Sequence, residues 1–274
     1  MDSRLKLWVG IGAFTLVQAG LPALDLAHGP IPAIGGHAWA QGGEGGEGGE
    51  GGEGGEGGER AIDPEQAAKD PAVYLTALDV IAAHYYAGRD AFAAGQTETA
   101  GAMFAHPIAE IYVDLEQVFV ARGVAPFGDK MEKASQLALE KKPAVEVNRA
   151  VADVLAALKQ ARTKAPGKLD LGVEARVLAD MIDRAALQYA SARKSTELEP
   201  YLDGYGFYMA AKAQAEQELP KIAAKDRAAA DAAKMALASL AEVYPTALRP
   251  KTLPDAGPVL GKATGAKLKL QNIR

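Results

Sequence analysis

The residues best suited to bind a metal ion are two histidines and two carboxylates in one stretch of the sequence. His106, Glu110 and Asp114 are spaced four residues apart, so in a helix their side chains share one face. His84 lies in the apolar segment that precedes them. Imidazole and carboxylate groups together suit divalent iron, zinc, copper or manganese. The spacing predicts a transition-metal site formed by His84, His106, Glu110 and Asp114.

Each histidine also has a purely structural interpretation. His84 falls on a line of small apolar residues between Ala77 and Ala91, where a core histidine normally bonds to a carbonyl or a carboxylate. His106 projects nearly opposite Ile111 on a helical wheel, as a residue on a solvated face would. Pro107 favours the site, because a proline inside a helix frees backbone carbonyls nearby. The sequence leaves both interpretations open.

Two five-residue segments share the pattern Glu-x-Tyr-x-Asp, residues 110–114 and residues 199–203. The preceding segments 78–81 and 179–182 are also similar. Such similarity indicates two related helical hairpins. Facing helices that contribute carboxylates are how bundles build internal metal sites, and this arrangement would add Asp180 and Asp203 to the ligands. Three matched positions also arise readily by chance in a chain rich in Ala, Asp and Glu.

Tyrosine outnumbers phenylalanine by nine to six. A buried tyrosine needs a partner for its hydroxyl group, so these rings predict either a polar pocket inside the bundle or rings wedged between helices with hydroxyls at the surface. Gly204 and Gly206 beside them permit close helix packing or local unwinding. The tyrosines in question are Tyr85, Tyr86, Tyr112, Tyr189, Tyr201, Tyr205 and Tyr208.

No complete catalytic motif is present in the sequence. The chain has no cysteine, which excludes disulfides, thiolate metal sites and cysteine nucleophiles. It contains no G-x-S-x-G motif and no phosphate-binding or dinucleotide-binding loop. We therefore assign no catalytic and no cofactor-binding residue, although the absence of cysteine leaves noncovalent haem at His84 or His106 open. We favour a binding or structural protein over an enzyme.

The elements that position these residues are helices. Apolar residues recur at helical spacing from residue 71 onward, and Pro107 predicts a kink at His106. The sequence predicts an all-α, up-and-down bundle of six to seven helices over residues 63–244, with two related hairpins. The expected helices are 71–94, 97–122, 128–141, 144–164, 171–193, one that starts from a capping box at 196–199, and 221–244.

The first 62 residues indicate export. Arg4 and Lys6 precede an apolar run, Leu7–Ala19, and Ala38 and Ala40 form a small-residue cleavage site, so residues 1–40 are predicted to be a signal peptide. The apolar run is too short to span a membrane, so no transmembrane anchor is expected after cleavage. Residues 41–62 contain six Gly-Gly-Glu triplets and are expected to form a disordered linker. The protein is expected to be periplasmic or secreted.

Charge and proline content set the remaining expectations. Six glutamates and Arg60 give the linker a net charge of −5, which equals that of the whole chain. The rest of the chain, outside residues 41–62, is nearly neutral and lacks the basic surface that a nucleic-acid-binding protein needs. Residues 245–274 contain four prolines and several lysines, which predicts an extended tail, either disordered or draped over the bundle.

In its general plan the chain resembles the imelysin-like helical domains of bacterial iron uptake, which are exported, Ala-rich and all-helical and carry a histidine and a glutamate on one helix. Those domains have a G-x-H-x-x-E motif, whereas three residues separate His106 from Glu110 here, so no site residue is transferred. Two functions remain. One is transition-metal binding inside an exported bundle, and the other is a non-catalytic scaffold without a metal site that holds an envelope protein partner.

Overall fold

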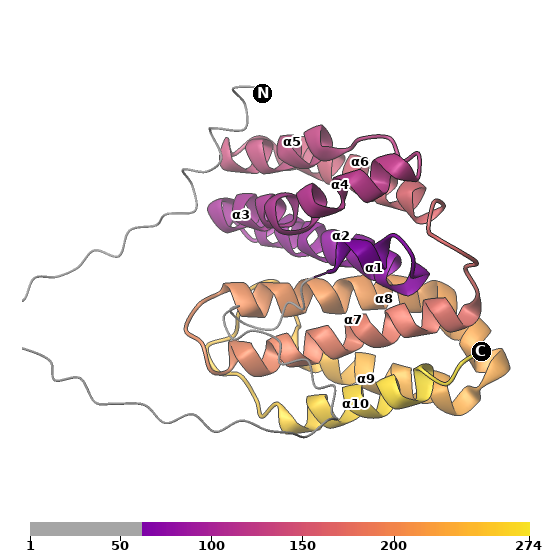
Figure 1. Ribbon diagram of the computed structural model, residues 1–274. Coiled ribbons are helices and arrows are strands. Elements are labelled where there is room, and N and C mark those ends of the chain that lie inside the picture. The colour runs from indigo at the N-terminus through magenta and orange to yellow at the C-terminus, as the bar shows by residue number, and fades with distance from the viewer. Residues whose placement is uncertain (1–61) are drawn as a thin grey trace, which may run out of the picture. The chain divides into compact units, whose positions relative to one another are not determined.

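The computed structural model describes residues 62–274, and these residues fold into helices joined by short loops, with no strand among them (Figure 1). The predicted all-α class is confirmed. The signal peptide and most of the linker lie outside the described residues. The helices are α1 (Pro64–Ala67), α2 (Pro71–Ala93), α3 (Thr97–Pro107), the π-helix η1 (Ile108–Tyr112), α4 (Val113–Ala121), α5 (Gly128–Leu139), α6 (Ala144–Arg162), α7 (Leu171–Ala192), α8 (Glu199–Lys225), α9 (Arg227–Val243) and α10 (Gly257–Leu270).

The helices form two four-helix groups with the same order of packing. In the first bundle α2 packs on α3, α3 on α5, α5 on α6, and α6 on α2. In the second bundle α7 packs on α8, α8 on α9, α9 on α10, and α10 on α7. Figure 1 shows the first bundle in indigo to magenta and the second in orange to yellow. Helix α2 packs against both α7 and α8 and so joins the two bundles.

The order of packing therefore recurs at the level of whole bundles. Segments 78–81 and 179–182 do lie at similar depths in the first helices of the two bundles, α2 and α7. The Glu-x-Tyr-x-Asp segments do not correspond, because residues 110–114 lie in and just beyond η1 whereas Glu199 is the first residue of α8. The sequence similarity of the two Glu-x-Tyr-x-Asp segments is therefore unrelated to the packing order that the two bundles share.

Aspartate side chains fix the starts of three long helices. Asp70 accepts a hydrogen bond from the Ala72 amide at 2.7 Å, Asp170 from Val173 at 3.1 Å, and Asp226 from Ala229 at 2.9 Å. Each carboxylate satisfies an amide that has no partner inside its helix. The Asp226 cap explains why the predicted helix 221–244 is in fact α9, starting at Arg227, while α8 continues to Lys225.

Helix α8 does not start as the sequence predicted. The capping box expected at residues 196–199 is absent, because Leu198 occupies the N-cap position and makes no side-chain capping bond. Pro200 lies in the first turn instead, where its fixed φ suits a helix and its missing N–H costs nothing. Glu199 is consequently the first helical residue, which leaves its side chain at the end of α8 that faces His106.

The helix is interrupted next to His106, as Pro107 predicted. α3 ends at Pro107, the chain then makes one π-helical turn, and α4 begins at Val113. Proline has no N–H to donate and its ring disturbs the preceding turn. The Phe104 carbonyl, in the last turn before the break, accepts a hydrogen bond from the Tyr85 hydroxyl of α2 at 3.2 Å. A tyrosine of the neighbouring helix thus supports the break.

Replacing Tyr85 with phenylalanine is expected to lower the free energy of unfolding by about 1 kcal/mol, because a buried carbonyl loses its donor. Urea unfolding followed by far-UV circular dichroism would measure the change. Tyr86→Phe is the matched control, since the neighbouring ring is only half-buried and should change stability by a few tenths of a kcal/mol, about the usual effect at surface positions. Equal losses in the two variants would contradict the role given to Tyr85.

The C-terminal residues differ from the sequence-based expectation. Residues 245–274 were expected to form an extended tail, but after a loop they form α10, which packs on α7 and α9. Its Val259, Ala263, Ala266 and Leu270 are buried at alternating spacings of four and three residues. Pro258 lies in the first turn of α10, where a proline does not break a helix. Lys267 pairs with Asp183 of α7 at 2.5 Å, so the second bundle extends to the end of the chain.

Within the described residues, no helix combines the length and the apolar character that a membrane crossing requires.

Candidate functional site

The two histidines predicted from the sequence lie together where the bundles meet. Their ring centroids are 6.4 Å apart, with the rings 71° from parallel. Both face carboxylates of α8: His106 Nδ1 lies 3.2 Å from Glu199 Oε1, and His84 Nε2 lies 3.8 Å from Asp203 Oδ1. We call His84, His106, Glu199 and Asp203 the histidine cluster.

His84 is buried and held in one orientation. Only 2 % of the residue is exposed, and its Nδ1 lies 2.9 Å from the carbonyl oxygen of Val80. Since a carbonyl can only accept, Nδ1 carries the proton in this bond and donates it. In a neutral ring Nε2 then holds the lone pair and faces Asp203. A ring anchored through its far N–H to a carbonyl is the usual arrangement of a metal-binding histidine.

The surroundings of His84 favour the neutral ring. Burial lowers the pKa of the His84 imidazole below its ordinary value, and the neighbouring His106 acts in the same direction. The bond to Val80 and the nearby carboxylates oppose this shift without reversing it. The neutral imidazole is the form that ligates metals.

Glu110 and Asp114 are placed differently by the π-helical turn. Glu110 is exposed in η1, and its carboxylate is near enough to raise the pKa of His84. Asp114 is exposed on α4, beyond the turn. A π-turn inserts an extra residue into the helix, so the regular spacing of four no longer places 106, 110 and 114 in one row. Among residues 62–274, the contacts that join the histidines to carboxylates do not include Asp114.

Glu199 and Asp203 take the place that the sequence gave to Asp114. The only sequence signal for them was the Glu-x-Tyr-x-Asp pattern, which named Asp203 as an additional ligand. Their approach to the histidines depends on α8 packing across α2. Helical spacing within one segment cannot reveal a contact of this kind.

Within residues 62–274, no three histidine or acidic side chains are already arranged to hold a metal ion. Two imidazoles on one tetrahedral ion have ring centroids about 5 Å apart, given metal–nitrogen bonds of about 2 Å. The observed 6.4 Å is therefore too long by about 1 Å for a shared tetrahedral ion. His84 and Asp203 are buried, whereas the His106 and Glu199 side chains are 32 % and 57 % exposed.

A second candidate site lies between the bundles on another side of α2. This interbundle cleft has a volume of about 590 Å³, within the range of small-molecule sites. Its apolar wall is formed by Leu78 of α2 and by Leu155 and Leu158 of α6. The remaining lining residues are Asp79, Ala82, Tyr86, Ala156, Lys159, Arg162, Glu174, Ala210, Ala213, Gln214, Gln217, Glu218 and Lys221.

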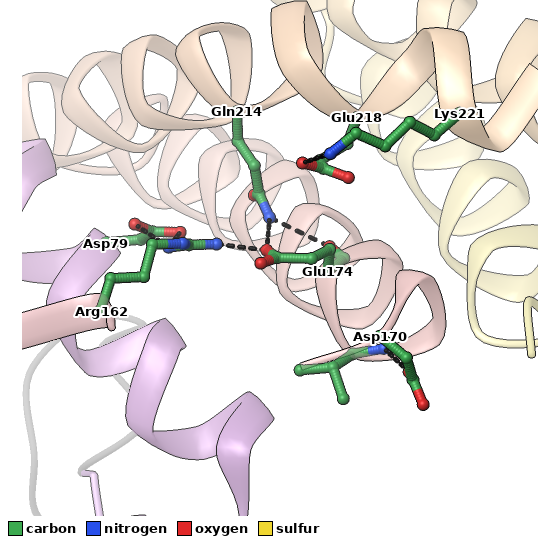
Figure 2. Close-up of polar contacts among 8 residues, drawn as sticks. Asp79, Arg162, Asp170, Glu174, Gln214, Glu218 and Lys221 are labelled. Carbon is green, nitrogen blue, oxygen red and sulfur yellow. Dashed lines mark hydrogen bonds and ion pairs between the residues drawn. The ribbon is translucent and has the colours of Figure 1, made fainter. Parts of the chain in front are cut away.

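Arg162 of α6 is the central charge of the cleft. Figure 2 shows its guanidinium between Asp79 of α2 and Glu174 of α7. It donates to both Asp79 carboxylate oxygens, at 3.1 and 3.3 Å, and also pairs with Glu174. Burial raises the pKa of Asp79 to about 6, although Arg162 acts to lower it. The three side chains connect α2, α6 and α7, so they tie the first bundle to the second.

Two buried side chains of α8 line the opposite wall (Figure 2). Gln214 Nε2 donates to the Glu174 backbone carbonyl at 3.0 Å and to its carboxylate at 3.4 Å. Lys221 donates to Glu218 Oε1 at 2.8 Å. The amide oxygen of Gln214, Oε1, and the second carboxylate oxygen of Glu218, Oε2, are buried and have no hydrogen-bond partner among the described residues. The sequence did not predict this cleft, because its lining residues come from four helices that only tertiary packing brings together.

Most tyrosine hydroxyls are bonded to the backbone rather than to a polar pocket. Tyr74 donates to Ala161, Tyr189 to Pro254, Tyr201 to Thr246 and Tyr244 to Ala185, at 2.8 to 3.0 Å. Tyr205 donates to the Asp90 carboxylate at 2.8 Å. Rings that pack in the core and bond to carbonyls of other segments hold helices and loops together. The abundance of tyrosine is thus explained by packing.

Comparison of the chain with protein-family models, with characterised proteins and with solved structures found no match. The resemblance of its general plan to imelysin-like domains therefore gains no support from these comparisons.

Proposed function

We propose that this protein is an exported binding protein for a divalent transition-metal ion, with the histidine cluster as its site. The pairing of each imidazole with a carboxylate of α8 carries the proposal. Donor atoms on one tetrahedral ion lie about 3.3 Å apart, given bonds of about 2 Å. The His106–Glu199 and His84–Asp203 separations of 3.2 and 3.8 Å are close to this value.

The local backbone also supports a binding role. A π-helical turn is uncommon and often marks a functional site, and η1 begins two residues after His106. Glu110 lies in this turn and near His84, so it is available as a further carboxylate. The ligand set of nitrogen and oxygen donors suits zinc, copper or iron rather than a thiolate-seeking ion.

The proposed ion would join the two bundles. His84 and His106 belong to the first bundle and Glu199 and Asp203 to the second. Binding at this junction would favour the docked arrangement and stabilise the folded chain by mass action. Export rests on the leader at residues 1–40, which supports a periplasmic or secreted location. No catalytic residue is proposed.

Titration of the mature protein, residues 41–274, with Zn²⁺ in a calorimeter tests the proposal. We expect one ion per chain, and we expect His84→Ala with His106→Ala to weaken binding by about 100-fold or more, because two of the ligands are lost. Asp114→Asn is the matched control and should bind like the wild type, since Asp114 lies beyond the π-turn.

Two outcomes would count against the histidine cluster. Unchanged affinity in the double histidine variant would remove both rings as ligands. No binding of Zn²⁺, Cu²⁺ or Fe²⁺ by the wild type would favour the alternative, a non-catalytic scaffold that engages an envelope partner.

A further inference from the structure

We infer that the interbundle cleft is a second binding site, independent of the metal proposal, for a small organic compound that carries a primary ammonium group. The cleft is formed by four helices from both bundles, and two acceptor atoms of its lining residues have no hydrogen-bond donor among residues 62–274.

Gln214 supplies the first acceptor. Its amide nitrogen donates to both the carbonyl and the carboxylate of Glu174. Turning the amide over would place its oxygen against those two acceptors, so Glu174 fixes the orientation. Gln214 Oε1 is thus held as an acceptor, inside a residue that is only 9 % exposed, without a donor among residues 62–274. Because a buried acceptor without a donor costs free energy, a ligand that donates a hydrogen bond to it would be stabilised.

Glu218 supplies the second acceptor, one helical turn further along α8. The residue is 6 % exposed, and Lys221 satisfies only its Oε1. Its Oε2 is buried and lacks a donor within the described part of the chain. Residues four apart in a helix share a face, and Gln214 and Glu218 both line the cleft from α8. An ammonium group has three N–H donors and matches such a pair of acceptors.

The charges beside Gln214 favour a cation over an anion, whereas the three acids and three bases that line the whole cleft cancel. Asp79, Arg162 and Glu174 together carry one net negative charge when both acids are ionised, and Glu218 with Lys221 is neutral. Lys159, by contrast, is exposed on α6. A ligand with its ammonium at Gln214 and Glu218 would place a carboxylate, if it has one, toward Lys159.

The apolar wall and the volume limit the size of the ligand. Leu78, Leu155 and Leu158 offer aliphatic contact beside the polar wall. A cleft of about 590 Å³ admits a compound of amino-acid size with a short hydrocarbon chain. Free amino acids and simple aliphatic amines share this chemistry.

Three probes of equal chain length distinguish the contribution of the ammonium group to binding from that of the carboxylate. Pentylamine, 5-aminopentanoic acid and pentanoic acid would be titrated into metal-free protein, with binding followed by saturation-transfer NMR and calorimetry. Both ammonium compounds are expected to bind and pentanoic acid is not. Tighter binding of 5-aminopentanoic acid would assign the carboxylate to Lys159, and equal binding would assign the site to amines. Failure of both ammonium compounds to bind at millimolar concentration, or equal binding of pentanoic acid, would overturn the inference.

Substitutions of the two acceptor residues test where in the cleft the ligand binds. Glu218→Gln and Gln214→Met are each expected to weaken pentylamine binding by about tenfold, the loss expected for one charged or polar contact. Glu132→Gln on the exposed face of α5 is the matched control and should leave it unchanged. Circular dichroism confirms that each variant is folded. A folded Glu218→Gln protein with wild-type affinity would overturn the assignment, whereas the double histidine variant should retain amine binding.

Discussion

Arg162→Met is expected to lower the free energy of unfolding by about 3 kcal/mol at pH 7, because it leaves two carboxylates without their shared cation. The guanidinium bonds to Asp79 and pairs with Glu174, and the three side chains are only 16 to 26 % exposed. Methionine keeps much of the side-chain length but offers no donor. Since Arg162 links α6 to α2 and α7, the loss should affect the docking of the two bundles directly.

This loss should depend on pH through Asp79. The pKa of Asp79 is raised to about 6 in the folded chain, from an ordinary value of 3.8. Between these values the folded state holds a proton that the unfolded state has released, so stability falls as pH rises through this range. The corresponding decrease is at most about 3 kcal/mol, at 1.36 kcal/mol per pH unit. Below the pKa of Asp79 in the unfolded chain, this loss of stability is absent. Above pH 6 it is fully present.

Urea unfolding of wild type, Arg162→Met and Asp79→Asn at pH 5 and pH 7 measures both effects. Asp79→Asn should remove the decrease in stability with pH that Asp79 causes. Removal of Arg162 eliminates the group that lowers the pKa of Asp79, so Asp79 should be protonated at pH 5 in that variant and the loss should be smaller there than at pH 7. An equal loss at both pH values would show that Asp79 does not titrate in this range.

Gly206→Ala is expected to destabilise the protein by about 2 to 3 kcal/mol, because an added methyl group overpacks the junction of α8 and α2. A Cβ at Gly206 would lie 2.4 Å from the Ala83 carbonyl oxygen and 2.9 Å from its carbon. Both are backbone atoms of α2, so no side chain can rotate away. The helices would have to separate by about 1 Å to reach ordinary van der Waals contact.

The same separation should disturb the histidine cluster. Ala83 precedes His84, and Asp203 lies one turn from Gly206 on α8. We therefore expect Gly206→Ala to weaken Zn²⁺ binding as well as folding. Gly265→Ala in α10 is the matched control, since a Cβ there meets nothing within 4 Å and alanine stabilises a helix interior by about 0.5 to 1 kcal/mol over glycine. Wild-type stability of Gly206→Ala in thermal and urea unfolding would contradict the close approach.

The sequence predicted the long helices well because local rules govern them. Helical spacing of apolar residues and the break at Pro107 act within a few residues, and α2, α3 and α7 begin at the predicted residues. His84 was likewise placed next to the apolar stripe of its helix, and it is buried.

The features that the sequence did not predict depend on contacts between distant segments. Prolines near residue 250 suggested an extended tail, yet α10 forms because its apolar stripe is buried on α7 and α9. Glu199 reaches His106 across a separation of more than ninety residues. The cleft combines residues from four helices, and the periodicity within any one helix does not predict that combination.

The central claim is that imidazoles of one bundle and carboxylates of the other share one metal ion. Electron paramagnetic resonance of the Cu²⁺-loaded mature protein, with ¹⁵N-labelled histidine, counts the coordinated imidazole nitrogens directly. We predict two nitrogens in the wild type and one in His106→Ala. A spectrum with oxygen ligands alone, as expected for an ion held by the glutamates of residues 41–62, would contradict the account.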